Sequence, residues 1–235
     1  MHLFGALILA TIASVAWSQH RIIVNYPPGG GLDATARMIA EKLSEHTGRS
    51  YVVENRAGAA GTIGAAALKG APPDGSMLLF APDSNISVYP HTVKKPTYLP
   101  LSDFVGIAHG GNYRIALAVS AAVPAKDLRE LVALSKSQSA PMGYGTAGAG
   151  TNLHFFATLL AQATGANMNH IPYRGTVPAL TDLVAGHVPA AVLPMGSMLS
   201  HGRSGKIRFL AQTGDERSAS LPDVPSFKEL GYPML

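Results

Sequence analysis

The chain has 235 residues, 47% of them hydrophobic and 14% charged, so its composition excludes a disordered protein and leaves room for two lobes. The formal net charge of +4 comes from scattered Lys and Arg residues without a basic run, so we expect no nucleic-acid partner. The absence of Cys excludes disulfide bonds and thiol chemistry.

Residues 1–18 are predicted to be a signal peptide. The apolar segment 3–15 has the length of a signal-peptide core and is too short to span a bilayer comfortably. Residues 16–18 (Ala-Trp-Ser) form a small-x-small cleavage pattern, and we place the cleavage after Ser18. Because no Lys or Arg precedes the apolar core, a buried N-terminal helix is the alternative. The first interpretation predicts export to the periplasm.

The first predicted unit of the fold is a strand at 21–26, a glycine-rich turn at 26–33 and a helix at 34–46. Apolar residues of the helix fall on one face, at Ala36, Ile39, Ala40 and Leu43. We expect Asp33 to cap the helix at its N-terminus and Gly48 to end it.

The turn of this unit, with Gly29, Gly30 and Gly31 in succession, has the properties of an anion site. Glycine permits positive φ and lets a ligand approach the backbone amides. The following helix begins with amides that lack intrahelical partners, and its dipole makes that end positive. We predict that this turn is half of a carboxylate clamp, with the other half at 145–151.

Strands and helices alternate along the rest of the chain, which predicts an α/β fold with mostly parallel sheets. The Pro-rich segment 88–101 has no periodicity and is expected to lead to a second lobe. Further strands are predicted at 51–54, 77–80, 115–119, 142–145, 169–172, 190–193 and 207–212. Further helices are predicted at 124–137, 151–162 and 177–185, with a short one ending near residue 70.

Ligands of open α/β sheets bind at the carboxyl ends of the strands, so the loops that follow strands are the candidate site. These loops are rich in Gly, Ser, Asn and Thr, which suits an anion that is bound without being transformed; the alternative is that each is only a tight turn. His154 either donates to a bound carboxylate or bonds a backbone carbonyl. The loops are 27–33, 56–61, 82–85, 146–151 and 173–175.

Enzymatic alternatives find little support. Residues 143–148 match G-x-G-x-x-G, but the acidic residue that a dinucleotide site needs is absent from 166–172. The chain has no G-x-S-x-G motif, no Cys and no close metal-ligand spacing among its nine His. We therefore predict no enzyme activity, no cofactor and no metal, and a nucleotide-dependent enzyme is the alternative.

Several motifs in a fixed order give the chain a family resemblance. It resembles the solute-binding receptors of tripartite tricarboxylate transporters, the Bug receptors, over nearly the whole mature chain. The motifs are Tyr26-Pro27-Pro28-Gly29-Gly30-Gly31-Leu32-Asp33 with Arg37, Glu54-Asn55-Arg56-Ala57-Gly58, Pro73-Asp74-Gly75, Tyr144-Gly145-Thr146-Ala147-Gly148-Ala149-Gly150-Thr151 with His154, Ile171-Pro172-Tyr173-Arg174-Gly175 and Leu221-Pro222-Asp223-Val224-Pro225.

This resemblance implies a periplasmic-binding-protein fold of type II, with two α/β lobes and a ligand cleft between them. The first lobe would span 19–104 and the second 105–221, with 222–235 returning to the first lobe. Family members usually continue for some tens of residues beyond this point. The implied function is a periplasmic, monomeric receptor that delivers a small carboxylate or dicarboxylate to a membrane permease. A ligand-sensing protein without a transport role is the alternative.

The resemblance also implies which residues bind the ligand. Loops 27–31 and 146–152 would hold one carboxylate through backbone amides and hydroxyls, and Ser84, Asn85 and Met195 would contact the distal end. The predicted ligand-binding residues are Tyr26, Pro28, Gly29, Gly30, Gly31, Asp33, Ser84, Asn85, Gly148, Ala149, Gly150, Thr151, Asn152, His154, Tyr173 and Met195.

Overall fold

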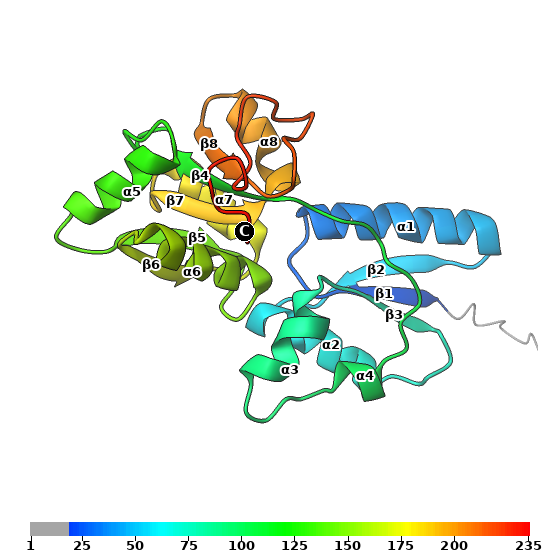
Figure 1. Cartoon of the computed structure of the whole chain (residues 1–235). Coiled ribbons are helices and arrows are strands. Elements are labelled where there is room, and N and C mark those ends of the chain that lie inside the picture. Colours follow the sequence, from blue (N-terminus) through cyan, green and yellow to red (C-terminus); the bar gives the residue numbers. More distant parts are fainter. Residues whose placement is uncertain (1–18) are drawn as a thin grey trace, which may run out of the picture.

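The computed structural model describes residues 19–235 and contains two α/β lobes, each built on its own sheet (Figure 1). The predicted signal peptide, 1–18, lies outside the described residues. None of the helices in 19–235 combines the length and apolar character of a membrane span.

The first lobe has a three-stranded parallel sheet in the order β2-β1-β3. Side chains alternate between the faces of the sheet, so Ile22 and Val24 of β1 pack against Ala36 and Ala40 of α1. The lobe comprises β1 (His20–Val24), α1 (Gly31–Thr47), β2 (Tyr51–Asn55), the 3-10 turn η1 (Ala59–Gly61), α2 (Thr62–Lys69), β3 (Met77–Phe80), the π-helical turn η2 (Ser84–Val88), α3 (Tyr89–Thr92) and α4 (Pro100–Asp103).

The second lobe has a five-stranded sheet in the order β6-β5-β7-β4-β8. Strands β5, β6 and β7 are parallel, but β4 runs antiparallel to β7 and β8, so this sheet is mixed where the sequence predicted mostly parallel pairing. The lobe comprises β4 (Ile115–Ser120), α5 (Leu128–Ser137), β5 (Met142–Thr146), α6 (Asn152–Thr164), β6 (Met168–Pro172), α7 (Thr176–Ala185), β7 (Ala190–Pro194), α8 (Met195–Arg203) and β8 (Ile207–Gln212).

Both faces of the second sheet are covered. On β4, Leu117 and Val119 face a core that includes α5 and α6, while Ala116 and Ala118 face α7 and α8. This alternation of larger and smaller apolar residues buries the strand on both sides, as expected for a central strand.

Helix α1 begins three residues earlier than predicted. Its N-cap is Gly30, which makes no side-chain capping bond, so the prediction that Asp33 is the N-cap is wrong. Asp33 lies in the first turn, where its negative charge interacts favourably with the positive end of the helix dipole. Gly48 ends the helix with φ 69°, as predicted.

The segment 88–101 is not the passage between the lobes. It contains α3 and α4, and Tyr89 of α3 and Tyr98 before α4 pack against Ala65 of α2 in the first lobe. The chain crosses to the second lobe later, in the extended segment 104–114 (Figure 1). Helix α8, which follows β7 without a connecting loop, was not predicted.

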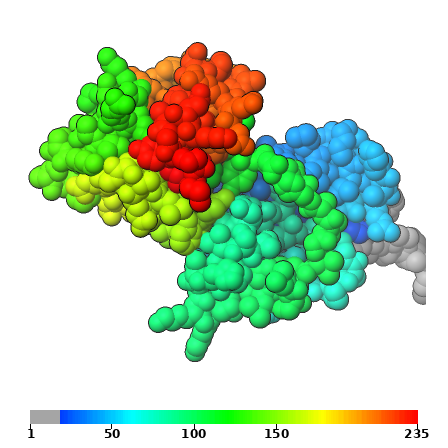
Figure 2. All heavy atoms as spheres, viewed as in Figure 1, coloured from blue at the N-terminus to red at the C-terminus, as the bar shows by residue number. Residues whose placement is uncertain are grey.

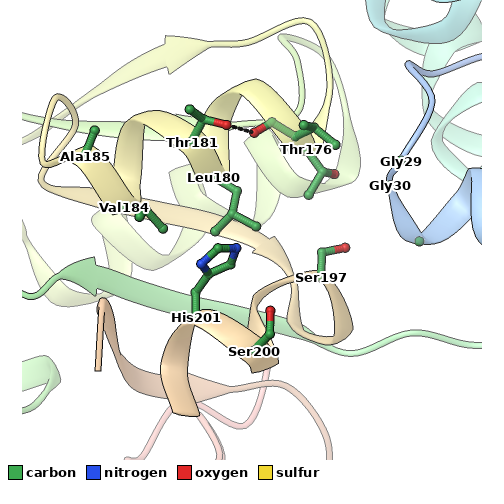
Figure 3. A pocket seen from close by; sticks show the side chains of 12 residues that line it. Gly29, Gly30, Thr176, Leu180, Thr181, Val184, Ala185, Ser197, Ser200 and His201 are labelled. Atoms are coloured by element: carbon green, nitrogen blue, oxygen red, sulfur yellow. Dashed lines mark hydrogen bonds between the residues drawn. The ribbon is translucent and has the colours of Figure 1, made fainter. Parts of the chain in front are cut away.

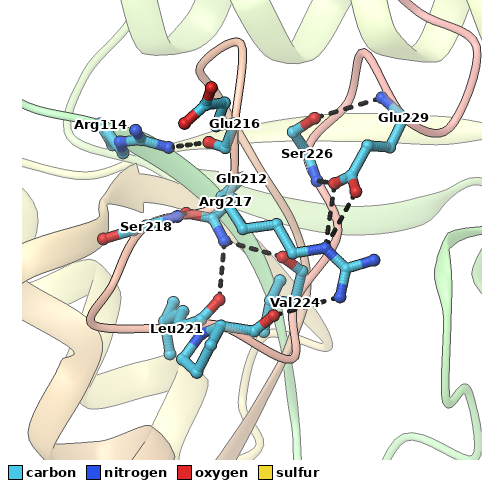
Figure 4. Close-up of polar contacts among 10 residues, drawn as sticks. Arg114, Gln212, Glu216, Arg217, Ser218, Leu221, Val224, Ser226 and Glu229 are labelled. Carbon is cyan, nitrogen blue, oxygen red and sulfur yellow. Dashed lines mark hydrogen bonds and ion pairs between the residues drawn. The ribbon is translucent and has the colours of Figure 1, made fainter.

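The C-terminal segment 222–235 packs on the second lobe, so the prediction that it returns to the first lobe is wrong. The Phe227 ring is fully buried in the core that contains Leu117 and Leu131. Buried Gln212 at the end of β8 holds the segment in place, because its amide nitrogen donates to the carbonyls of Leu221 and Val224 (Figure 4). The segment is therefore anchored to the second lobe by an apolar contact and by amide hydrogen bonds.

Candidate functional site

Loops from the two lobes meet at the carboxyl ends of the strands. A Cβ built on Gly148 would lie 3.3 Å from that of Ala60, and one on Gly175 would lie 2.7 Å from Cδ of Pro27. A Cβ on Gly31 would lie 3.6 Å from the Ser197 hydroxyl. Loops 27–33, 56–61, 146–151 and 173–175, which the sequence placed at one edge, are therefore together.

The first glycine loop, residues 27–33, offers unpaired amides at the N-terminus of α1. The first helical bond is from the Ala34 amide to the Gly30 carbonyl, at 3.0 Å. The amides of Gly31 and Leu32 make no hydrogen bond within the described chain. The Gly29 amide is occupied, because it donates to Asp33 Oδ2 at 3.0 Å.

Asp33 shapes this loop from behind. Its buried carboxylate accepts two hydrogen bonds from Arg37, at 3.0 and 3.1 Å, and one from Asn55 Nδ2 at 2.9 Å. Burial raises the pKa of Asp33, but hydrogen bonds from Arg37, Gly29 and Asn55 outweigh it and hold the pKa below its usual value. Arg37 thus forms an i, i+4 ion pair with Asp33 along α1.

The second glycine loop, residues 146–152, is organised around Thr151, the N-cap of α6. The Thr151 hydroxyl accepts from the His154 amide at 3.3 Å and donates to the Gly148 carbonyl at 2.8 Å. The Gly148 and Gly150 amides bond side chains of their own lobe. The amides of Ala149, Thr151 and Asn152 make no hydrogen bond within the described chain, so the second loop matches the first in offering several donors.

Two stacked histidines support the second glycine loop. The rings of His154 and His170 are 3.9 Å apart, and His154 Nδ1 accepts from the Gly150 amide at 3.3 Å. His170 Nε2 lies 2.7 Å from the Thr146 hydroxyl. Burial lowers the pKa of both rings, and the neighbouring His154 helps to lower that of His170 to about 4. The neutral form of His154 therefore supports the loop by accepting the hydrogen bond from Gly150.

The η1 turn joins the two glycine loops through Ala60. Ala59 and Ala60 have φ values of 47° and 53°, in the left-handed region that alanine rarely adopts. The Ala60 carbonyl accepts from the Tyr26 hydroxyl at 3.3 Å and from Asn85 Nδ2 at 3.0 Å. These two bonds hold a strained backbone at the point where the lobes touch.

A cavity of about 1520 Å³, here named the interlobe cavity, runs from the glycine loops to β3 and segment 104–114. Figure 2 shows that segment, in green, arching over the hollow. Its polar wall connects both lobes, since Asp83 Oδ1 accepts from Asn152 Nδ2 at 3.0 Å and from the Tyr113 hydroxyl at 3.3 Å. Partial burial, with the charge of Asp83, raises the pKa of Tyr113 to about 12, and burial raises the pKa of Tyr26 as well.

The structure brings some of the predicted residues to the interlobe cavity and places others elsewhere. Tyr26, Gly30, Gly31, Ser84, Thr151 and Asn152 line it. Asn85 is buried behind it and accepts from Asn25 Nδ2 at 2.8 Å. Tyr173 donates to Asp182 within the second lobe, and Met195 is buried in that lobe's core.

Asp83, Tyr113 and Ser197 are among the residues of the cavity wall that were missing from the predicted ligand-binding set. Asp83 stood out as an acidic residue in a loop otherwise free of charge, which is a signal that could have found it. Tyr113 lies in the extended crossing segment and Ser197 in the unpredicted helix α8, so neither had a local signal.

A smaller cavity of about 540 Å³ lies between α7 and α8 and reaches Gly29–Gly31. Figure 3 shows Ser197, Ser200 and His201 of α8 facing Leu180 and Val184 of α7.

Within residues 19–235, no group of three or more His, Asp or Glu could hold a metal ion. Amides and hydroxyls are thus the main polar groups at the glycine loops.

Comparisons with known proteins agree with this architecture. Residues 35–234 match the model of the tripartite tricarboxylate transporter family receptor. The protein BugT of Bordetella pertussis is 35% identical over 214 residues, which cover 91% of this chain and 66% of BugT. Among solved structures, MatC (Rpa3494) from Rhodopseudomonas palustris with bound malate is 28% identical with a TM-score of 0.85, covering 92% of this chain and 73% of that one. R. palustris Rpa4515 with adipate is 30% identical with a TM-score of 0.83, covering 92% and 72%.

The relatives are longer than this chain. The chain spans 66%, 61% and 64% of the lengths of three curated relatives that it matches.

Proposed function

Because the chain belongs to the tripartite tricarboxylate transporter receptor family, we propose that it is a solute-binding receptor that holds a small carboxylate between its two lobes. The observation that carries this proposal is the pair of helix N-termini at one cavity. Gly31 and Leu32 on one side, and Thr151 and Asn152 on the other, line this cavity and have amides without partners in the described chain. Such amides bind a carboxylate with charge-assisted hydrogen bonds.

The two-lobed arrangement supports a mechanism in which the ligand closes the cleft. A carboxylate that bonds amides of both loops interacts more strongly with the closed state than with the open one, and this difference in affinity drives closure. The proposed setting is the periplasm, where the closed receptor presents its ligand to a membrane permease. The malate and adipate in related structures support a small carboxylate as the ligand class.

Binding without catalysis fits the groups at the site. The glycine loops contribute amides and hydroxyls, and the neutral histidines behind them are occupied with the loop itself. A sensing role would use the same closure with a signalling partner in place of the permease. Co-purification with membrane subunits distinguishes the two roles.

The proposal is tested by calorimetric titration with carboxylates of four to six carbons. Gly31→Val should weaken binding at least tenfold, or about 1.4 kcal/mol, because the side chain enters the gap beside Ser197. The backbone at Gly31 is helical with ordinary φ, so the variant should fold. Gly70→Val is the matched control, since Gly70 has φ −82° and lies outside both cavities. Equal affinity of Gly31→Val and the native protein would place the site elsewhere.

A further inference from the structure

The charge of the interlobe cavity distinguishes among carboxylate ligands. Asp83, in the loop after β3, places its carboxylate on the cavity wall. It bonds the side chain of Asn152, whose main-chain amide belongs to the second glycine loop. The acidic group therefore lies at the far end of the Asn152 side chain from the second glycine loop.

Two side-chain oxygens, Oδ2 of Asp83 and the hydroxyl of Ser84, lack a hydrogen-bond partner of good geometry in the described chain. Both hydrogen bonds to its carboxylate go to Oδ1, and Oδ2 has no hydrogen-bond donor within the described chain. The next residue, Ser84, is 97% buried at the cavity wall; its hydroxyl faces that of Tyr26 but makes no hydrogen bond of acceptable geometry. Asp83 is exposed, so its free oxygen is open to a ligand, whereas an unsatisfied buried hydroxyl such as that of Ser84 is costly. Together these two oxygens indicate a place for a ligand group that donates hydrogen bonds.

Positive charge is scarce around them. Lys69 is the one Lys or Arg among the described residues that line the interlobe cavity, and it pairs with Asp103 at 3.0 Å. Arg37, the arginine closest to the first glycine loop in sequence, is engaged by Asp33 and Asn55. A second carboxylate on the ligand would meet Asp83 without a compensating cation, and the two like charges would repel each other.

We propose that the ligand is a small zwitterion, with a carboxylate on the glycine loops and a protonated amine at Asp83 Oδ2 and Ser84. This inference rests on the proposed function and narrows its ligand class. It separates the chain from the structures with malate and adipate, whose ligands are dicarboxylates. The amine supplies the donors that both free oxygens lack, and its charge offsets that of Asp83.

Calorimetric titration with 4-aminobutyrate and succinate tests the inference, because the two probes share a four-carbon chain and differ at the distal end. The native protein should bind 4-aminobutyrate at least tenfold more tightly than succinate. Asp83→Asn keeps an oxygen for Asn152 and Tyr113 and removes the charge, so it should reduce that ratio at least tenfold. Asp223→Asn is the control for net charge, since Asp223 is exposed and its side chain makes no ion pair in the described chain; its ratio should equal that of the native protein.

The pair 5-aminopentanoate and glutarate repeats the comparison with one more carbon, and Ser84→Ala should weaken the amine-bearing probes selectively. Succinate and glutarate binding more tightly than the amines, with a ratio that Asp83→Asn leaves unchanged, would overturn the zwitterion and leave the carboxylate receptor in place. A folded protein that binds none of the four probes or other small carboxylates would overturn both proposals.

Discussion

The two lobes carry the same strand, glycine loop and helix unit, but their cores differ in how completely the strands are buried. In the second lobe, β4 and β7 are almost entirely buried between two helical layers. In the first lobe, every residue of β2 and β3 is only partly buried. Beside the interlobe cavity Leu101, Val105 and Ile107 are 97%, 89% and 78% exposed. The second glycine loop is thus supported by a packed core, whereas the first depends on a local polar network around Asp33.

The largest expected effect is on the packed lobe. Phe227→Ala should lower the free energy of unfolding of the second lobe by about 3–5 kcal/mol, because it opens a cavity at a fully buried ring. Urea unfolding followed by hydrogen exchange in β4 and β8 measures this. Leu101→Ala, on the exposed apolar surface of the first lobe, should stay within about 0.5 kcal/mol. Equal losses in both variants would contradict the contrast between the cores.

The next effect concerns the polar network of the first lobe. Asp33→Asn removes the charge paired with Arg37 and places an amide donor among donors from Gly29, Arg37 and Asn55, so the lobe should lose about 1–3 kcal/mol. The folded-state pKa of Asp33 lies below its usual value. Its stabilisation is therefore present above about pH 4 and is lost as the pH falls through the lower folded-state pKa.

Acid unfolding monitored by exchange in β1 and β2 checks this prediction. The variant should lose the part of the acid transition that Asp33 contributes. Asp215→Asn, which removes an exposed partner of Lys228, is the control and should leave the transition unchanged. Identical acid transitions in Asp33→Asn and the native protein would show that the network does not support the lobe.

The smallest expected effect, because His170 is only partly buried, is a dependence of the second lobe's stability on pH. His170 has a pKa lowered to about 4, against about 6.5 in an unfolded chain. Between these values the unfolded state binds more protons, so the second lobe should lose stability as the pH falls from 6.5 to 4. His170→Gln should flatten this slope in urea titrations, while exposed His91→Gln should not. A slope unchanged by His170→Gln would assign the pH dependence to other groups.

Much of the fold could be predicted because its signals are local. Alternating apolar strands and helical periodicity placed most elements within a few residues; Gly48 ended α1, and α7 ended at residue 185, as predicted. The helix cap was predicted at Asp33 because Asp is a good capping residue, but the glycines before it allow α1 to begin at Gly31. Helix α8 was missed since it starts directly after β7 and contains two glycines.

In the candidate site too, the parts with local sequence signals were predicted and the long-range contacts were not. The glycine loops are local motifs, and the sequence brought them together through the rule for strand ends. The contact of Asp83 with Asn152 joins residues 69 positions apart, and that of Asn152 with Tyr113 joins residues 39 apart. No periodicity encodes such pairs. The destination of 222–235 was similarly unreadable, because Phe227 would suit either core.

The single crossing at 104–114 makes the two lobes a tethered pair. Within residues 19–235 the backbone passes between the lobes once, through a segment that is mostly exposed. Eleven residues reach at most about 40 Å when fully extended, so each lobe is held near the other at an effective concentration on the order of millimolar. One covalent connection permits twisting as well as bending. A protease that cuts this segment would therefore leave two polypeptides held together by noncovalent contacts alone, and a bridging ligand would set how long they remain associated.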